Sequence, residues 1–197
     1  MIQLPNTLTV LRILLVPVFA LAFELPGETG RLASFVIFCL AGVSDALDGL
    51  AARKLSARSE FGRMLDPIAD KILVAVALMM LVESRVLHGF ELIPALVILA
   101  REILVSGLRE FLASASVSVP VTRVAKMKTV LQMISIGAML LGPDADRIVP
   151  GALYLAYMLL WIAAALTVYT GLAYLRAGIA HVRADQPAPQ PRPGSPA

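Results

Sequence analysis

Long apolar runs constrain the fold of this chain more than any other feature. Stretches of about 20 apolar residues, enough to cross a bilayer as a helix, recur along most of the 197 residues. Hydrophobic residues make up 58% of the sequence and charged residues only 16%, whereas soluble domains have roughly half and a quarter. The runs are continuous rather than alternating, which excludes a β-barrel. The sequence therefore predicts an all-α integral membrane protein.

Six transmembrane helices are predicted, separated by segments rich in Gly, Pro, Ser and acidic residues. The expected spans are residues 8–25, 32–53, 61–82, 92–114, 124–141 and 152–175. Residues 1–182 are expected to form one six-helix transmembrane domain. Residues 183–197 are rich in Pro and Ala and have almost nothing to bury, so this segment is predicted to be a disordered tail.

The distribution of basic residues predicts the orientation of these spans. The loops at one side of the predicted bundle receive most of the basic residues: Arg53, Lys54, Arg58, Arg63, Arg109, Arg123, Lys126, Lys128, Arg176 and Arg183. The opposite loops hold only Arg31, Arg85 and Arg147, among several acidic residues. The positive-inside rule therefore places the first side, and both termini, in the cytoplasm. The net charge of +3 is modest, and no nucleic-acid partner is expected.

Four aspartates interrupt the apolar pattern within one short stretch. Asp45 and Asp48 lie in the last turns of the second predicted span, and Asp66 and Asp70 lie in the first turns of the third. At about 100° per residue, positions 45 and 48 share one helix face, and so do positions 66 and 70. The linker between the spans is short, which predicts antiparallel neighbours. The four carboxylates are then expected to converge near the cytoplasmic surface.

Converging carboxylates in a membrane protein favour a metal site. Each ionised carboxylate in hydrocarbon costs roughly 2.5–3.5 kcal/mol, and nearby Arg and Lys side chains offset only part of this. Clustered carboxylates with few soft ligands suit hard divalent cations such as Mg²⁺ or Mn²⁺. Two such ions would form a clamp for displacement at phosphorus. The small residues Gly49, Ala52 and Gly62 lie on the same helix faces and would leave room for a ligand.

Written as a pattern, residues 45–70 read D-x2-D-G-x2-A-R-x8-G-x3-D-x3-D. This pattern resembles the signature of the CDP-alcohol phosphatidyltransferase family without a departure. The segments "LPNTLTVLRILLVPVF", "AREILVSGLREF" and "KMKTVLQM" further resemble the bacterial family members that make phosphatidylglycerophosphate. Together these motifs cover about residues 4–135, and the rest of the chain agrees only in hydrophobicity and length.

The resemblance implies an activity and a site. The enzyme would transfer the phosphatidyl group of CDP-diacylglycerol to the primary hydroxyl of sn-glycerol 3-phosphate, with release of CMP. By this resemblance the four aspartates would hold two divalent cations, Mg²⁺ or Mn²⁺, and Asp70 would also be the catalytic general base. The CDP-binding residues would be Asp45, Asp48, Gly49, Ala52, Arg53 and Gly62. The resemblance also implies a homodimer in the bacterial inner (cytoplasmic) membrane, with the active site facing the cytoplasm.

The acceptor carries a phosphate dianion, which needs cations beside the metals. Arg101 lies in the middle of an apolar span, where a charged residue indicates a functional role by default. An ion pair with Glu102 or with the aspartate cluster is the alternative explanation. Arg109 and Lys128 are the further candidates for the acceptor phosphate. Anchoring of the helices by positive charge at the cytoplasmic face is the alternative for both.

Three other interpretations remain open at this point. The same fold could act on another acceptor, such as phosphatidylglycerol, serine or inositol phosphate. Intramembrane carboxylates also mark ion paths, so a cation transporter is a second interpretation. The location of the aspartates at one face and the lack of broken, repeated helices count against transport. A non-catalytic membrane scaffold is the third, and it predicts that Asp70→Asn leaves function intact.

Overall fold

The computed structural model describes the backbone of residues 4–55, 60–117 and 122–184. Side chains are described over the same ranges except at 4–8, 45–55, 60–64, 66 and 67. Over these ranges the chain is helical and has no strand. The long helices are α1 (Leu4–Phe23), α2 (Gly27–Leu55), α3 (Glu60–Glu83), α4 (Leu92–Ser114), α5 (Arg123–Leu141) and α7 (Ala152–Ala184). Two short elements connect them: the 3₁₀ helix η1 (Gly89–Glu91) and α6 (Pro143–Ile148).

The long helices lie where the apolar runs predict helices, with some different ends. Helix α2 begins at Gly27 rather than at residue 32, and α7 continues to Ala184, well past residue 175. The added residues are more polar than the predicted spans. The spans were predicted from the apolar length that a bilayer requires, and a helix can continue beyond that length. Residues 185–197, most of the predicted tail, lie outside the described residues.

Two helices of the described residues are long and apolar enough to cross a membrane, by length and composition: Arg123–Leu141 in α5 and Ala152–Arg183 in α7. The apolar part of α1, Thr9–Phe23, is shorter. Helix α4 carries Arg101, Glu102 and Arg109 within its length. Two membrane-crossing candidates agree with a membrane protein, and the expectation of six spans stays a prediction.

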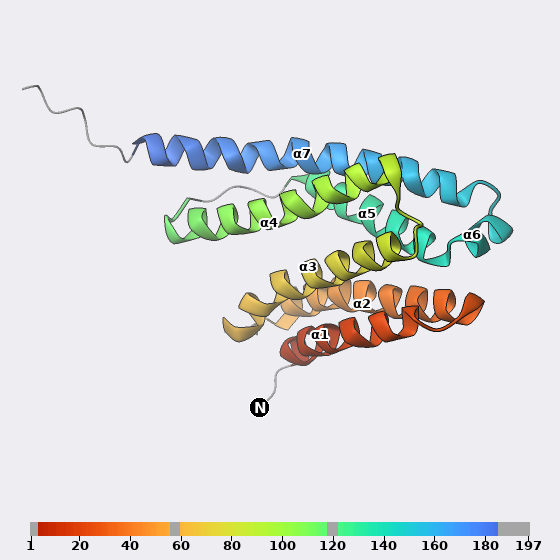
Figure 1. The fold of residues 1–197 in the computed structure, drawn as a ribbon. Helices are drawn as coiled ribbons and strands as arrows, with labels where there is room; N and C mark the ends of the chain where they lie inside the picture. Colours follow the sequence, from red (N-terminus) through yellow and green to blue (C-terminus); the bar gives the residue numbers. More distant parts are fainter. Residues whose placement is uncertain (1–3, 56–59, 118–121, 185–197) are drawn as a thin grey trace, which may run out of the picture.

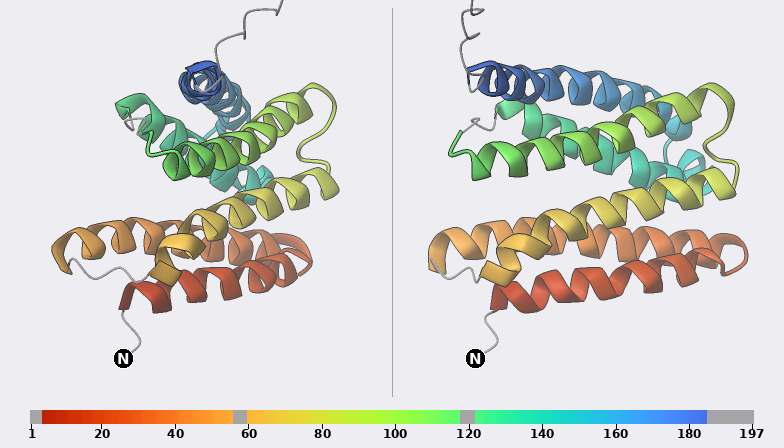
Figure 2. Two further views of the ribbon diagram at one scale, coloured as in Figure 1. Left: turned by 90° about the vertical axis from the view of Figure 1, so that its left-hand side faces the viewer. Right: turned by 60° about the vertical axis from the view of Figure 1, so that its left-hand side comes forward.

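Consecutive long helices run in opposite directions (Figure 1). One end of the bundle therefore holds the beginnings of α1, α3 and α5 and the ends of α2, α4 and α7, and we call it the cavity end. The opposite end holds the α1–α2 turn, η1 and α6. Figure 2 shows two layers, with α1, α2 and α3 in one and α4, α5 and α7 in the other. The aspartate-bearing ends of α2 and α3 both lie at the cavity end.

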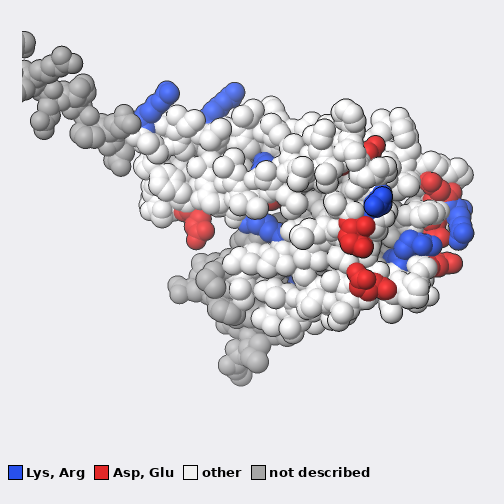
Figure 3. All heavy atoms as spheres, in the orientation of Figure 1, with Lys and Arg blue, Asp and Glu red and all other residues white. Residues whose placement is uncertain are grey.

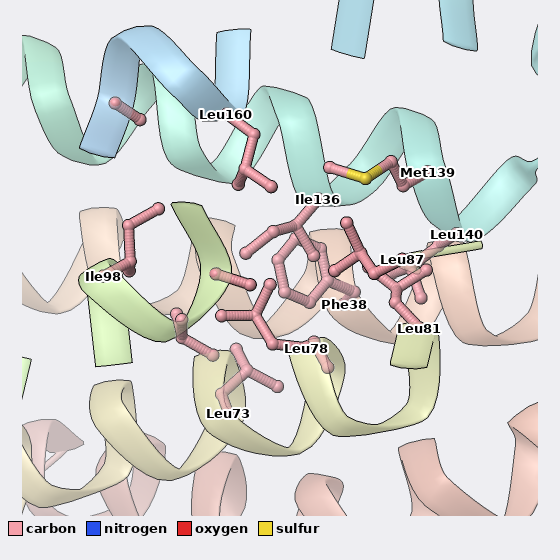
Figure 4. Close-up of a cluster of buried hydrophobic side chains, with 14 of the residues drawn as sticks. Phe38, Leu73, Leu78, Leu81, Leu87, Ile98, Ile136, Met139, Leu140 and Leu160 are labelled. Carbon is pink, nitrogen blue, oxygen red and sulfur yellow. The ribbon is translucent and has the colours of Figure 1, made fainter. Parts of the chain in front are cut away.

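The apolar core lies between the two layers. Large side chains from five helices meet there, all less than 3% exposed: Phe38, Leu78, Leu81, Ile98, Ile136 and Leu160 (Figure 4). Because each layer contributes to this cluster, its burial holds the layers together. The core thereby supports the charged residues at the cavity end.

Apolar side chains also cover much of the outer surface. On the face that Figure 3 shows, most charged groups lie toward the two ends of the helices, and the surface between them is largely uncharged. Large apolar side chains that are more than half exposed occur along the bundle: Leu14, Leu40, Met79, Ile103, Val130 and Tyr169. A surface of this kind is unusual in water and typical of helices in contact with lipid.

Candidate active site

A cavity of about 1110 Å³ lies between the two helix layers. Its charged part is lined by residues from α3, α4 and α5: Asp70, Lys71, Arg101, Glu102, Arg109, Lys126 and Lys128. Its other part runs between α2 and α5 toward α6 and is mainly apolar, with Phe35, Met133 and Ile148 among the lining residues. The cavity is therefore charged at one end and apolar along the rest of its length.

Asp70 is the one aspartate of the motif whose side chain the structure describes. Its Oδ1 accepts a hydrogen bond from Nη1 of Arg12 at 2.8 Å, and the Asp70 side chain is 48% exposed. The Arg12 side chain, which comes from α1, is completely buried. A buried guanidinium compensates the carboxylate charge and limits its orientation. Helix α1 thus contributes directly to the position of Asp70.

Lys128 reaches into the cavity from α5 and pairs with α4. Its ammonium donates a hydrogen bond to Oε1 of Glu102, and its side chain is only 8% exposed. Next to Asp70, Lys71 of α3 donates to the hydroxyl of Ser106 on α4. Both cations therefore bridge neighbouring helices, and both residues line the cavity.

Arg101 is anchored mainly to α7. Its Nε donates to the carbonyl of Thr167 at 2.9 Å, and its Nη2 donates to the hydroxyl of Thr170 at 2.9 Å. The ion pair with Glu102 exists but is long, with 3.4 Å between Nη1 and Oε1. The ion pair with Glu102, one of the two alternative explanations of Arg101, thus describes only one of its contacts.

Arg109 lies at the exposed edge of the cavity. Its Nη2 donates to the hydroxyl of Tyr174 at 3.2 Å, and its guanidinium carbon lies 5.3 Å from the centre of the same ring. Tyr174 itself is 7% exposed. Stacking on a buried aromatic ring fixes the guanidinium beside the cavity while leaving other donors available.

The structure brings four of the candidate residues into one cavity: Asp70, Arg101, Arg109 and Lys128. The other motif residues belong to α2 and α3, but their side chains lie outside the described residues: Asp45, Asp48, Gly49, Ala52, Arg53, Gly62 and Asp66. Among the side chains that are described, no group of three or more His, Cys, Asp or Glu could hold a metal ion. The metal and CDP sites thus stay predictions. Asp70, a hard oxygen donor in the cavity, fits the expected cations.

Several residues that line or support the cavity were not among the predicted site residues. Arg12 and Lys71 are charged residues inside predicted spans, and that signal alone marks them as candidates. Glu102 was expected only as a partner of Arg101, yet it also binds Lys128. Thr170 and Tyr174 gave no signal, because a threonine and a tyrosine in an apolar helix are common packing residues.

The chain belongs to the CDP-alcohol phosphatidyltransferase family, which it matches over residues 2–169. Several bacterial relatives named CDP-diacylglycerol–glycerol-3-phosphate 3-phosphatidyltransferase are similar over most of their length. The Rickettsia felis protein is 46% identical over 178 residues, which are 89% of this chain and 94% of the relative. The Pseudomonas fluorescens protein is 42% identical over 188 residues, 93% of each chain. The Haemophilus influenzae protein is 39% identical over 177 residues, 88% of this chain and 92% of the relative.

Proposed function

We propose that this protein transfers the phosphatidyl group of CDP-diacylglycerol to sn-glycerol 3-phosphate, giving phosphatidylglycerophosphate and CMP. The observation that carries the proposal is the cavity in which Asp70, the last aspartate of the family motif, lies with Arg101, Arg109 and Lys128. A carboxylate beside several cations suits a reaction between a hydroxyl group and phosphorus, with a phosphorylated acceptor. The relatives' names describe the same donor and acceptor.

The donor would bind at the aspartate motif. Asp45, Asp48, Asp66 and Asp70 would hold two divalent cations, which would neutralise the pyrophosphate and stabilise the departing CMP. Gly49, Ala52, Arg53 and Gly62 would line the CDP site. The apolar part of the cavity is continuous with the charged part. A molecule such as the donor could therefore place its charged head in the charged part and its apolar body in the apolar part.

Asp70 would act as the general base. The acceptor oxygen would form a bond to the phosphorus that carries diacylglycerol, and the bond from this phosphorus to the CMP oxygen would break. The hydroxyl proton would pass to the Asp70 carboxylate. The hydrogen bond from Arg12 orients this carboxylate, and its 48% exposure leaves it accessible to an acceptor.

The phosphate of the acceptor would bind to the cations on α4 and α5. Arg101 and Lys128 already share the carboxylate of Glu102, so an entering dianion would meet charges that are held in place by the protein. Arg109 would contact the phosphate from the edge of the cavity. These three residues favour a phosphorylated acceptor over serine or another zwitterion.

We further propose that the bundle lies in the bacterial inner membrane with its cavity end and both termini in the cytoplasm, and that the protein is a homodimer. The apolar outer surface and the basic residues at the cavity end support the orientation. The homodimer is carried by family resemblance alone.

The deciding experiment uses purified protein in detergent or nanodiscs, CDP-diacylglycerol, Mg²⁺ or Mn²⁺, and a panel of acceptors. The proposal expects CMP release with glycerol 3-phosphate, and little with serine, inositol phosphate or phosphatidylglycerol. If the protein prefers another acceptor, the proposed acceptor is wrong and the proposed phosphatidyl transfer still holds. Cation flux in proteoliposomes without CMP release would support a transporter instead.

A further inference from the structure

Arg101 is held mainly by a single turn of α7, and its contact with Glu102 on its own helix is long, at 3.4 Å. Nε donates to the carbonyl of Thr167, and Nη2 donates to the hydroxyl of Thr170, both at 2.9 Å. The hydroxyl of Thr170 in turn donates to the carbonyl of Leu166 at 2.8 Å, so its lone pairs are available to Arg101. Two adjacent nitrogens of one planar group are thereby fixed, and this sets the plane of the guanidinium.

Gly171 makes room for this arrangement. A β-carbon at position 171 would lie 3.2 Å from Nε of Arg101 and 3.3 Å from its Cγ, closer than an ordinary van der Waals contact. The absence of a side chain therefore allows Arg101 to lie against the backbone of α7. Thr170 and Gly171 therefore both affect the Arg101 guanidinium. Thr170 accepts a hydrogen bond from it, and Gly171 leaves the space that it occupies.

We propose that Thr170 and Gly171 are positioning residues that hold the Arg101 guanidinium toward the acceptor phosphate. The inference rests on the proposed function, in which Arg101 binds that phosphate. Both residues lie beyond residue 169, where the family match ends. Neither residue lines the cavity, whereas Arg101 does. Their effect on the reaction therefore passes through Arg101.

The direction of the fixed group supports this role. A guanidinium has five N–H donors, and α7 binds those at Nε and on one side of Nη2. Nη1 points to Glu102, at a long 3.4 Å, on the cavity wall. A phosphate binds a guanidinium best through two donors in a defined geometry. A group fixed beforehand binds with a smaller entropic cost than one that must first be ordered.

The test compares Thr170→Val, which keeps the shape but removes the acceptor oxygen, with Thr170→Ser, which restores it. For Thr170→Val we expect the KM for glycerol 3-phosphate to rise about tenfold, with the KM for CDP-diacylglycerol unchanged. Thr170→Ser should remain within about twofold of the parent protein. Ser135→Ala is the matched control, because the Ser135 hydroxyl also bonds to α7, at the Ala156 carbonyl, and does not line the cavity. It should affect thermal stability and neither KM.

A second pair of variants covers the case in which Thr170→Val does not fold. Gly171→Ala should also raise the acceptor KM, because the new methyl group displaces Arg101. Gly178→Ala is its control: the added carbon would meet the end of the flexible Leu108 side chain, at 2.8 Å from Cδ1, away from Arg101. Equal acceptor KM values in Gly171→Ala and Gly178→Ala would overturn the inference. So would a Thr170→Val variant that loses stability but keeps the parent acceptor KM.

Binding of inorganic phosphate alone separates this inference from the proposed function. The parent protein should bind phosphate about tenfold more tightly than Thr170→Val, measured by calorimetry without either substrate. If the parent enzyme rejects glycerol 3-phosphate but this difference holds, the proposed acceptor is wrong and the positioning role stands. If glycerol 3-phosphate is the acceptor and the difference is absent, the positioning role is wrong.

Discussion

The two halves of helix α3 are surrounded by different kinds of side chains. In its first half, Asp70 bonds to Arg12 of α1, and Lys71 bonds to Ser106 of α4. Further along, Leu81 is completely buried among apolar groups. Hydrogen bonds fix direction, whereas apolar packing is non-directional and scales with buried area. The first half of α3 therefore orients the reactive groups, and the second half contributes most of its part of the folding stability.

A charged cluster at the opposite end of the bundle extends this comparison. Asp144 of α6 accepts hydrogen bonds from Arg31 at 2.6 Å and from Arg147 at 2.9 Å. These three residues resemble the cavity charges in type, but none of them lines the cavity. The cluster ties α6 to the beginning of α2. A carboxylate–arginine pair is thus present at both ends, and only one pair is expected to take part in the reaction.

The largest expected difference is in kcat, between Asp70→Asn in the cavity and Asp144→Asn at the opposite end. Asp70→Asn should lower kcat by roughly 10²- to 10⁴-fold, because an amide can neither accept the proton nor balance a metal charge. Its thermal stability should fall as well, because removal of the carboxylate charge leaves the completely buried Arg12 less compensated, although an amide oxygen can still accept its hydrogen bond. Release of CMP and thermal unfolding are measured on the same preparations.

Asp144→Asn is the control for this exchange. It removes the same charge from an arginine-bound aspartate at the other end, so we expect reduced stability and a kcat close to that of the parent. Full transferase activity in Asp70→Asn would contradict the assignment of the general base. It would instead support the scaffold interpretation of the sequence.

The second largest effect is expected from truncation of the core on the same helix. Leu81→Ala should lower the free energy of unfolding by about 2 to 5 kcal/mol, because Leu81 is 0% exposed and a void would remain. The kcat per folded molecule and both KM values should stay within about twofold. Unfolding in mixed detergent micelles measures the first quantity. A selective rise in one KM would show that core packing also orients the reactive groups.

Much of the fold could be predicted because apolar length and turn residues act locally. The runs between Gly- and Pro-rich segments gave the long helices, and the opposite directions of consecutive helices follow from their short connections. Helix α6 and η1 could not be predicted, since elements of six and three residues have too short a pattern to recognise. The end of α7 was missed because its last turns continue as helix after the apolar run has ended.

The site could be predicted only in part, for a physical reason. A charge in the middle of an apolar span indicates a function, and this signal singled out Arg101. Lys128 was predicted as a cation near the cytoplasmic end of its span, and both residues line one cavity with Asp70. The partners of these charges depend on which helices pack together and how each is rotated. Arg101 and Thr170 are 69 positions apart, and Arg12 and Asp70 are 58 apart. Helical periodicity defines the faces of one helix and contains no information about such pairs.

The smallest expected effect concerns the pH dependence of the charged cluster at the opposite end. The hydrogen bond from Arg31 holds the pKa of the Asp144 carboxyl below its ordinary value, against the effect of desolvation, and the charges of Arg31 and Arg147 lower it further. A carboxyl whose pKa is lower in the folded protein binds its proton more weakly than in the unfolded chain. It therefore contributes stability at pH values above its unfolded pKa, about 4, and this contribution is lost as the pH falls through the folded pKa.

Asp144→Asn removes this contribution, so its thermal unfolding temperature should lie below that of the parent at pH 7. The difference should shrink as the pH falls from about 4, where the carboxyl of the unfolded chain takes up its proton, through the lower folded pKa, where the carboxyl of the folded parent becomes neutral as well. The effect should be small and sensitive to salt, because Arg31 and Arg147 are 32% and 72% exposed and exposed pairs are screened. Unfolding temperatures of both proteins across this pH range measure it. A difference that stays constant with pH would mean that Asp144 stabilises α6 by shape and hydrogen bonding alone. The two ends would then differ in what a carboxylate contributes, with charge required only in the cavity.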